Sequence, residues 1–482
     1  MEDRGLSAVV EDDVDMEEDE DEDEEDKFVS KYFKKRFLVK RKRMNGNDGE
    51  TPAKSIEESL ANLSTKEIYF KVKSDNFSEK LYGTKQIRKL VSSSENNSSI
   101  FNEILSHEIL KALADCLSLP NEELQFETAW ILTNISAGSL EQTKALFDLF
   151  IHLTLLKLFK TECNANIANQ TLCAIGNIMA ENDGFCYDCI YAGITEPLIK
   201  QMKKFLDNVP FMRTVSWVIG QMSHLKDTIF FKETAWDLFP ALGELARNED
   251  SEVCINAVWG LGYLTEGDID LLMNFNKNVI KTVAPYLISS NLELQIATLH
   301  FFANCASGND EITQKIVNCG VIKNLNEFLN HKNVEVVRET VWMLSNILAG
   351  TEKQIKAVFD AGLMPKIIEL LESSDKNVAE KALWAVTNVP LCGTPEQINL
   401  LLNLNVIPSL CYLLKSDKNQ ILEAVVEAIN KIQQNCSNRK GKIRQSIITS
   451  GNSVERLREL QNHYSETLQR NATQILTDLF NE

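Results

Sequence analysis

The hydrophobic positions of this chain recur with helical spacing from about residue 77 to the end and show no strand-like alternation there. Residues 333–373 illustrate one unit of the pattern. A long apolar-periodic stretch, VEVVRETVWMLSNIL, is followed by Gly350, and a shorter stretch, EKQIKAVFDAG, ends at Gly362. A third stretch, MPKIIELLE, carries Pro365 near its start, where a helix tolerates proline. The pattern therefore predicts three helices in one unit.

A column of large side chains, called here the Trp column, shows that this unit repeats. Its members are Trp130, Cys173, Trp217, Trp259, His300, Trp342, Trp384 and Val426. Their successive gaps are 43, 44, 42, 41, 42, 42 and 42 residues. One such helical unit cannot bury its own apolar face, so the units must stack on one another. Three helices in this length is the armadillo plan, and we expect an all-α, right-handed armadillo-repeat solenoid of roughly nine to ten three-helix repeats.

A second column, called here the Asn column, lies four residues after the first. It contains Asn134, Asn177, Gln221, Tyr263, Asn304, Asn346, Asn388 and Asn430. Residues at positions i and i+4 share one face of a helix, so each unit presents a large side chain beside a carboxamide. Large aromatic side chains at helical spacing usually form a core. A repeated carboxamide fits a core poorly, because a buried amide needs partners, and so the pair favours a surface ladder.

Such a ladder suits an extended, lysine-rich peptide. A carboxamide has both donors and an acceptor, so it can hold a peptide backbone without reading its side chains. Indoles on neighbouring repeats leave slots roughly 8–10 Å apart, the spacing of packed helices. A lysine stem can lie between two indoles while nearby carboxylates take its charge. The carboxylates nearest the ladder in sequence are Glu127, Glu181, Glu339 and Glu380.

The charge of the chain is unevenly distributed. The net charge is -19, of which residues 1–26 contribute -15 through sixteen acidic residues and Arg4. Residues 27–43 contribute nine Lys and Arg and no acid, which leaves -19 + 15 - 9 = -13 for residues 44–482. An acidic body indicates basic partners and argues against nucleic-acid binding by the body. We expect an acidic disordered tail (1–26), a basic segment (27–44), a linker (45–76) and the repeat array (77–482).

Between residues 80 and 482 the chain resembles the importin-α (karyopherin-α) family. The resemblance rests on the sequences WILTN, WGLGYLTEG, WMLSN and WAVTN, and on the C-terminal VERLRELQNHYSETLQRNATQIL. It implies a nuclear import adaptor that shuttles between cytoplasm and nucleus. Such a protein binds basic localisation signals of cargo proteins in a concave Trp/Asn groove, links them to importin-β, and docks an export receptor at its last repeat.

The resemblance also implies two peptide sites. A major site would comprise Trp130, Asn134, Asn177 and Trp217, with a lysine pocket of Gly138, Thr143 and Glu181. A minor site would comprise Asn304, Glu339, Trp342, Ser345, Asn346, Glu380, Trp384 and Asn388.

The sequence departs from the family at several of these positions. Cys173 stands where the family has Trp, Gln221 where it has Asn, Glu181 where the lysine pocket usually has Asp, and His300 where the family has Arg. We therefore hypothesise that the major site is weakened and that the minor site carries more of the binding. His300 is interpreted as a tolerated spacer in preference to a pH switch.

The basic segment resembles the C-terminal part of the family's importin-β-binding domain, although the upstream Arg-rich part is absent. In the family this domain folds back onto the cargo groove when it is free. A self-inhibitory or importin-β-binding role is therefore expected for the basic residues Lys34, Lys35, Arg36, Lys40, Arg41, Lys42 and Arg43. A solvated charge run, or a localisation signal of the protein itself, is the alternative.

Other functions find little support in the sequence. The eleven cysteines suggest no disulfide framework, and the pair Cys186 and Cys189 lacks the second pair or the histidines of a zinc site. We expect no cofactor, no metal, no enzymatic activity and no membrane-spanning segment. A catenin-like armadillo scaffold, which binds acidic partners in a basic groove, is the main alternative, and the acidic body and Trp/Asn columns argue against it.

Overall fold

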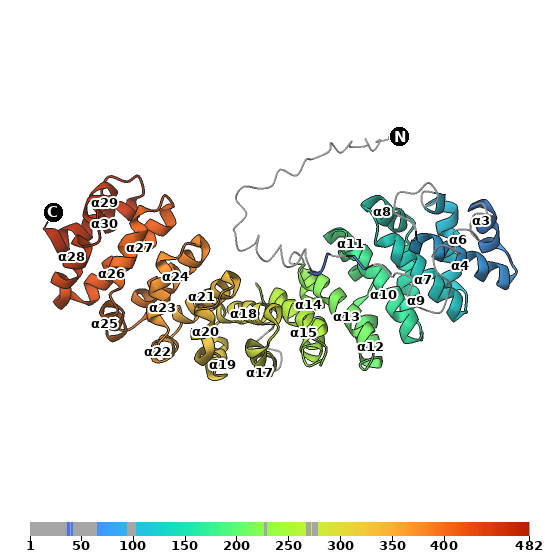
Figure 1. Ribbon diagram of the computed structural model, residues 1–482, viewed down its shortest axis with the longest axis horizontal. Coiled ribbons are helices and arrows are strands. Elements are labelled where there is room, and N and C mark those ends of the chain that lie inside the picture. Colours follow the sequence, from blue (N-terminus) through green and yellow to red (C-terminus); the bar gives the residue numbers. More distant parts are fainter. Residues whose placement is uncertain are drawn as a thin grey trace, which may run out of the picture.

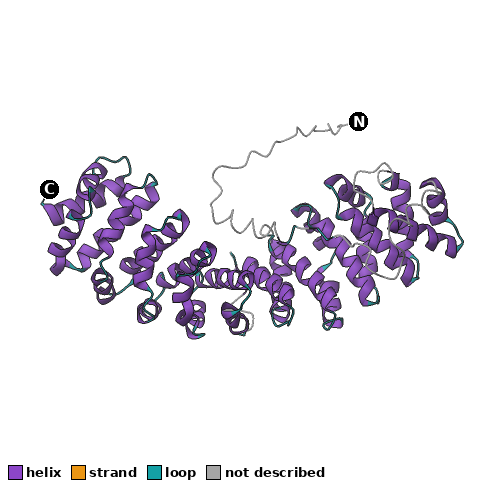
Figure 2. Cartoon of the chain, viewed as in Figure 1, coloured by secondary structure: helices purple, strands orange, loops and turns teal. Residues whose placement is uncertain are grey.

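The computed structural model describes residues 36–38, 40–41, 65–93, 103–225, 229–266, 271 and 278–481. Within these ranges the chain forms helices and turns and contains no strand (Figure 2). The helices follow one another along an elongated, curved row, with α3 at one end and α30 at the other (Figure 1). The predicted all-α solenoid is confirmed.

One long helix of each repeat packs on the long helix of the next, and these are called here the stacking helices. The pattern of residues 333–373 is confirmed, since a stacking helix there is followed by two shorter helices. The stacking helices are α4 (Phe77–Ser93), α7 (Glu122–Ser136), α10 (Ala165–Met179), α13 (Val209–Ser223), α15 (Ser251–Thr265), α18 (Leu292–Ala306), α21 (Val334–Leu348), α24 (Lys376–Cys392), α27 (Asn419–Asn435) and α30 (Glu466–Phe480).

The remaining helices, all but α14 shorter than the stacking helices, complete the repeats and pack against them. They are α3 (Thr65–Lys73), α6 (His107–Ser118), α8 (Leu140–Asp148), α9 (Ile151–Phe159), α11 (Asp183–Tyr191), α12 (Thr195–Lys204), α14 (Ile229–Leu245), α17 (Val279–Val283) with the 3₁₀-helix η1 (Ala284–Ile288), α19 (Asp310–Asn318), η2 (Val321–Asn324) with α20 (Leu325–Leu329), α22 (Glu352–Asp360), α23 (Met364–Glu369) with η3 (Leu370–Glu372), α25 (Pro395–Asn403), α26 (Val406–Tyr412) with η4 (Leu413–Lys415), η5 (Ser437–Arg439), α28 (Lys440–Ile448) and α29 (Ser453–Leu460).

Most stacking helices begin directly after an Asn or Asp whose side chain accepts a hydrogen bond from the first turn. An acidic or amide oxygen at this position satisfies backbone N–H groups that have no partner inside the helix. These caps recur with the period of the Trp column, because each repeat starts its long helix in the same way. They are Asn121, Asn164, Asn208, Asp250, Asn291, Asn333 and Asp375.

The turn between the two short helices of a repeat requires a left-handed backbone. Gly193, Gly320, Gly362 and Gly451 take this position with φ between +66° and +79°. Glycine adopts this conformation without the steric cost that a Cβ brings. Asn405 and Phe150 occupy the same turn in two other repeats, with φ of 62° and 55°.

The structure shortens the predicted linker of residues 45–76. Residues Thr65–Lys73 form α3, which packs on α4 and buries Ile68 and Val72. The linker prediction missed this helix because its apolar positions are few and its remaining residues are polar. The few apolar side chains of α3 pack against α4, and this contact is enough to stabilise the helix.

One further observation concerns membranes. Across the described ranges, no single helix combines the length and apolar composition of a membrane span. Only α25 taken together with the segment Val406–Lys415 reaches these values, and the two are bent by 76° from one another.

The left-handed turns give a test of the repeat fold. Gly362→Ala places a Cβ at φ +69° and should lower the free energy of unfolding by about 1–2 kcal/mol, although no atom crowds it. The matched control is Gly441→Ala, which lies in α28, is equally uncrowded, and should raise stability by up to about 1 kcal/mol. Urea midpoints of both variants would be compared with the parent. Equal shifts in one direction would contradict the assigned backbone conformations.

Candidate functional site

Both columns lie along the stacking helices, and the surface that carries them is called here the column face. Much of the ladder is buried in the intact chain, in part beneath the basic segment. Trp217 and Trp259 are fully buried, and Trp130, Asn134, Asn177 and Asn304 are also buried. Both members of a pair are partly exposed at Trp342 with Asn346 and at Trp384 with Asn388, and Cys173 is partly exposed as well.

Close packing between neighbouring repeats and the residues of the basic segment that lie on Trp217 and Asn177 together explain this burial. The indole of Trp217 lies so close to α10 that a Cβ at Gly176 would stand 2.4 Å from its Cζ3 atom. Trp259 stacks on Tyr263 at 5.7 Å between centroids and contacts His300 at 5.1 Å. The column face is therefore partly a repeat-to-repeat interface.

The Asn column also connects the repeats. The Nδ2 groups of Asn304, Asn346 and Asn388 donate to carbonyl oxygens of the preceding stacking helix at 2.9–3.1 Å, and Asn177 Nδ2 donates to Thr133 O at 3.1 Å. Each of these carboxamides thus has a hydrogen-bond partner, a backbone carbonyl of the preceding stacking helix. The sequence alone did not reveal this partner. Because this bond uses the nitrogen, the amide oxygen stays available for another group.

The basic segment lies on the column face, and Lys40 is held by the three residues of the predicted lysine pocket. Its Nζ donates to Gly138 O at 3.1 Å and Thr143 Oγ1 at 2.8 Å, and forms an ion pair with Glu181. The Lys40 and Glu181 side chains are only about 15% exposed. Residues from α8 and from the ends of α7 and α10 therefore surround one ammonium group.

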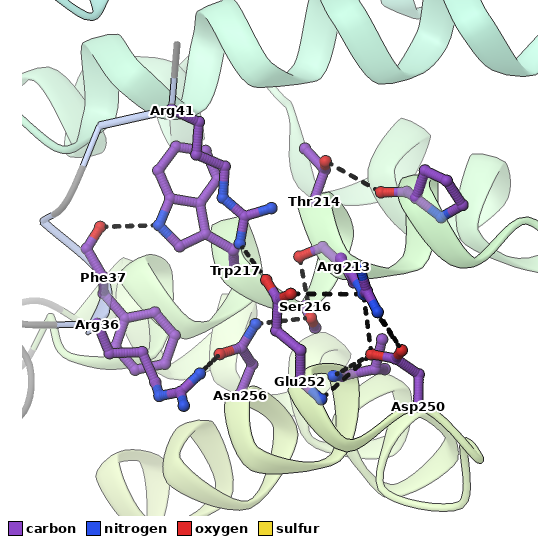
Figure 3. A network of polar contacts seen from close by, with 12 residues as sticks. Arg36, Phe37, Arg41, Arg213, Thr214, Ser216, Trp217, Asp250, Glu252 and Asn256 are labelled. Atoms are coloured by element: carbon purple, nitrogen blue, oxygen red, sulfur yellow. Dashed lines mark hydrogen bonds and ion pairs between the residues drawn. The ribbon is translucent and has the colours of Figure 1, made fainter. Parts of the chain in front are cut away.

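Arg41 is held through both its backbone and its side chain. Its N–H donates to Asn177 Oδ1 at 2.7 Å, and its carbonyl accepts from Asn177 Nδ2 at 2.9 Å. The guanidinium lies 4.6 Å from the Trp217 ring centroid and pairs with Glu252 at 2.8 Å (Figure 3). The carboxamide holds the backbone and the indole stacks on the cation, as the ladder argument predicted for a basic peptide.

Phe37 and Arg36 extend this contact toward later repeats. Trp217 Nε1 and Gln221 Nε2 donate to the Phe37 carbonyl at 3.0 and 2.8 Å. Arg36 donates to Asn256 Oδ1 at 2.8 Å, as Figure 3 shows, and pairs with Glu293 at 2.7 Å. From Arg36 to Arg41 the contacts pass from α15 and α18 back to α7 and α10, so the segment runs antiparallel to the order of repeats.

Burial changes the acid–base properties of several groups here. Burial lowers the pKa of the Arg41 guanidinium, and Cys173 and Glu252 act in the opposite direction. The pKa of Glu127 is raised by burial despite the opposing charge of Arg88. Burial also raises the pKa of Tyr263 well above its usual value, so its hydroxyl stays protonated at neutral pH.

Trp130 meets a cation from its own array. Arg88 Cζ of α4 lies 4.5 Å from the Trp130 ring centroid, and Arg88 Nε lies 2.6 Å from the carboxylate of Glu127. Arg88 comes 42 residues before Trp130 and so occupies the Trp-column position of α4. Asn134 donates to Ser92 Oγ at 3.0 Å. Glu127 is thus engaged inside the array by Arg88.

The predicted minor-site residues fall into two groups. Glu339 is 3% exposed and contacts His300 Nδ1 at 3.2 Å. His300 lies between Trp259 and Trp342, whose centroids are 5.1 and 5.5 Å from it, so it is a packed interface residue and more than a spacer. Glu339 is therefore not placed to receive a cation at the surface.

The second group remains accessible. Trp342, Trp384, Asn346 and Asn388 are partly exposed, and Lys381 Nζ lies 5.2 Å from the Trp342 centroid. Ser345 is buried, with its hydroxyl donating to Trp342 O at 2.8 Å and its carbonyl accepting from Asn388. Glu380 pairs with Lys418 at 3.0 Å. A greater role for the minor site stays a prediction.

Three residues that contact the basic segment were not predicted from the sequence: Asn256, Glu252 and Glu293. Glu252 and Glu293 stand seven residues before Trp259 and His300, two helical turns away on the same face. A search for carboxylates seven residues before each member of the Trp column would have found both glutamates. The predicted basic residues Lys34, Lys35, Lys42 and Arg43 lie outside the described residues.

Cys186 and Cys189 are buried in α11, and burial raises the pKa of Cys189 to about 12. A thiol in this state is a poor metal ligand or nucleophile at neutral pH. In the part of the chain that the structure describes, no three His, Cys, Asp or Glu side chains converge as a metal site requires.

The lysine pocket can be tested through the reactivity of Lys40. Glu181→Gln removes the carboxylate charge, so an amine-reactive reagent should label Lys40 about tenfold faster, which corresponds to about 1.4 kcal/mol. Labelling would be followed by mass spectrometry. The control is Glu162→Gln, which removes exposed pairs with Lys200 and Lys204 and should leave Lys40 unchanged. Unchanged labelling in Glu181→Gln would contradict the pocket.

Comparison with known proteins agrees with this architecture. The armadillo/beta-catenin-like repeat family model matches residues 309–349 and 351–389. An engineered protein of known crystal structure superposes with a TM-score of 0.73 over 86% of this chain and 98% of its own, at 23% identity, which bears on the fold alone.

Importin subunit alpha-2 of Caenorhabditis elegans is 30% identical over 277 residues, which cover 56% of this chain and 51% of the relative. Importin subunit alpha-3 of the same organism is 31% identical over 189 residues, 39% of this chain and 36% of the relative. The chain thus matches about half or less of the length of these curated relatives. The chain thus has the fold of an armadillo-repeat solenoid and is similar in sequence to importin α subunits.

Proposed function

We propose that this chain is a nuclear import adaptor that binds basic localisation peptides on its column face. The observation that carries the proposal is the two-bond clamp of Asn177 on the Arg41 backbone beside the pocket of Lys40. This geometry takes an extended peptide, and it selects a lysine by charge and by the two oxygens from Gly138 and Thr143. A cargo with a similar sequence would make the same contacts.

The charge of the site supports a basic ligand. Glu181, Glu252 and Glu293 each pair with a cation of the basic segment. A catenin-like scaffold would need cations on this face for an acidic partner. The three carboxylates therefore favour the adaptor over the scaffold.

The basic segment would compete with cargo for this face. A tethered ligand meets its site at an effective concentration of about millimolar, so even a modest intrinsic affinity keeps weak cargo out. When importin-β binds the segment, the face would be released for cargo. Partnership with importin-β, docking of an export receptor on the last repeat, and shuttling between cytoplasm and nucleus belong to this proposal by kinship with importin α subunits.

Lys40→Ala in the intact chain tests both parts of the proposal. It removes the contacts of the segment with the lysine pocket, so a labelled lysine-rich localisation peptide should bind at least about tenfold more tightly. Fluorescence anisotropy at fixed salt measures this change. The control is Lys356→Ala, since Lys356 pairs with Asp360 on the exposed face of α22.

Unchanged peptide affinity in Lys40→Ala would show that the segment does not compete. Absence of binding in both the parent and the variant would contradict the adaptor function itself.

A further inference from the structure

The side chain of Phe37 is fully buried on the column face, although it belongs to a short segment far from the array in sequence. Its ring lies directly over Gly220 of α13. A Cβ built at Gly220 would stand 1.9 Å from Phe37 Cε1 and 2.5 Å from Cζ. The ring therefore fills space that any side chain at position 220 would occupy.

Comparison with the equivalent positions of other repeats shows that the space over Gly220 is filled differently. The position before the Asn column is Thr133 in α7, Ser345 in α21 and Thr387 in α24, but glycine in α10, α13 and α15. Gly176 and Gly262 make room for side chains of the next stacking helix, since their nearest atoms belong to Trp217 and His300. At Gly220 the nearest atoms belong to Phe37 instead. This one glycine opens the column face to the bound segment.

The walls of this pocket suit an aromatic ring. The Tyr263 ring meets Phe37 edge-on, at 6.0 Å between centroids and 74° between planes, an arrangement that aromatic pairs prefer. Trp217 and Gln221 both donate to the Phe37 carbonyl, so the backbone is fixed at the point where the side chain enters. Figure 3 shows Phe37 beside Trp217, with Arg36 and Asn256 next to it.

The pocket for Phe37 and the lysine pocket bind residues at a fixed spacing along the segment. Phe37 lies three residues before Lys40, and the structure holds both side chains on the column face. Arg36 adds a cation beside it, bound by Asn256 and Glu293. The contacts therefore read the sequence Arg-Phe-x-x-Lys-Arg, and the Phe position is read by shape and apolar burial while the others are read by charge.

We propose that the column face selects basic peptides that carry an aromatic residue three positions before the pocket lysine. This inference rests on the proposed function and names the peptide class that the site prefers. Gly220, Tyr263 and Gln221 are the residues that determine the preference. The basic segment is the chain's own example of such a peptide, and Phe37 would make it a stronger competitor than its charge alone.

The test uses the intact chain with Phe37→Ala and Lys40→Ala, which weaken the tethered segment and leave both pockets intact. Three labelled peptides are compared by anisotropy: KKRFLVKRKR, the sequence of residues 34–43; KKRALVKRKR; and KKFRLVKRKR, which has the same composition and charge as the first. The first should bind about tenfold or more tightly than the other two, because only it places Phe over Gly220 while its Lys reaches Glu181.

Adding Gly220→Ala to the same chain should remove this preference and leave the affinity for KKRALVKRKR unchanged. Alanine is favoured in a helix, so the variant is expected to fold, and its thermal unfolding would be checked. Two results would overturn the aromatic pocket but not the adaptor function. One is equal affinity of the three peptides for the double variant that keeps Gly220. The other is a preference for KKRFLVKRKR that survives Gly220→Ala. Absence of binding by all three would overturn the proposed function and the pocket with it.

Discussion

The site depends on the carboxamide of Asn177, which bonds both to the preceding repeat and to the bound basic segment. Its nitrogen donates to Thr133 of the preceding stacking helix and to the carbonyl of Arg41, while its oxygen accepts from the Arg41 N–H. One side chain thus joins two repeats and also holds the backbone of an extended segment. Because the repeats are regular, the same amide recurs along the array and keeps the stacking helices in register. The face that binds is also the face that holds the repeats together.

Charge and shape have separate roles on this face. The carboxylates of Glu181, Glu252 and Glu293 receive the cations of Lys40, Arg41 and Arg36, and Trp217 stacks on Arg41. Gly220 provides the space for an apolar ring between these charges. Farther along, His300 fills the gap between Trp259 and Trp342 and engages Glu339, so the column face is closed there by its own side chains. The described residues of the basic segment lie on the repeats from α7 to α18.

The sequence predicted the solenoid because a fixed period of a large residue and a carboxamide is a property of the repeat itself. It also predicted that Gly138, Thr143 and Glu181 surround a lysine, through a family resemblance, and the structure brings them together around Lys40. It did not predict the burial of Trp217 and Trp259, because burial depends on how closely neighbouring repeats approach and, at Trp217, on the basic segment that covers it. The pocket at Gly220 was missed for a related reason, since a missing side chain leaves no chemical signature.

The account is tested most directly by the position of Phe37 in the intact chain. Phe37 would be replaced by a photo-crosslinking phenylalanine, and the crosslinked residues would be identified by mass spectrometry with and without an excess of a basic peptide. The account predicts crosslinks to α13 and α15, around Gly220 and Tyr263, that the peptide suppresses. Crosslinks elsewhere, or crosslinks to α13 that the peptide leaves unchanged, would contradict a face shared by the basic segment and its cargo.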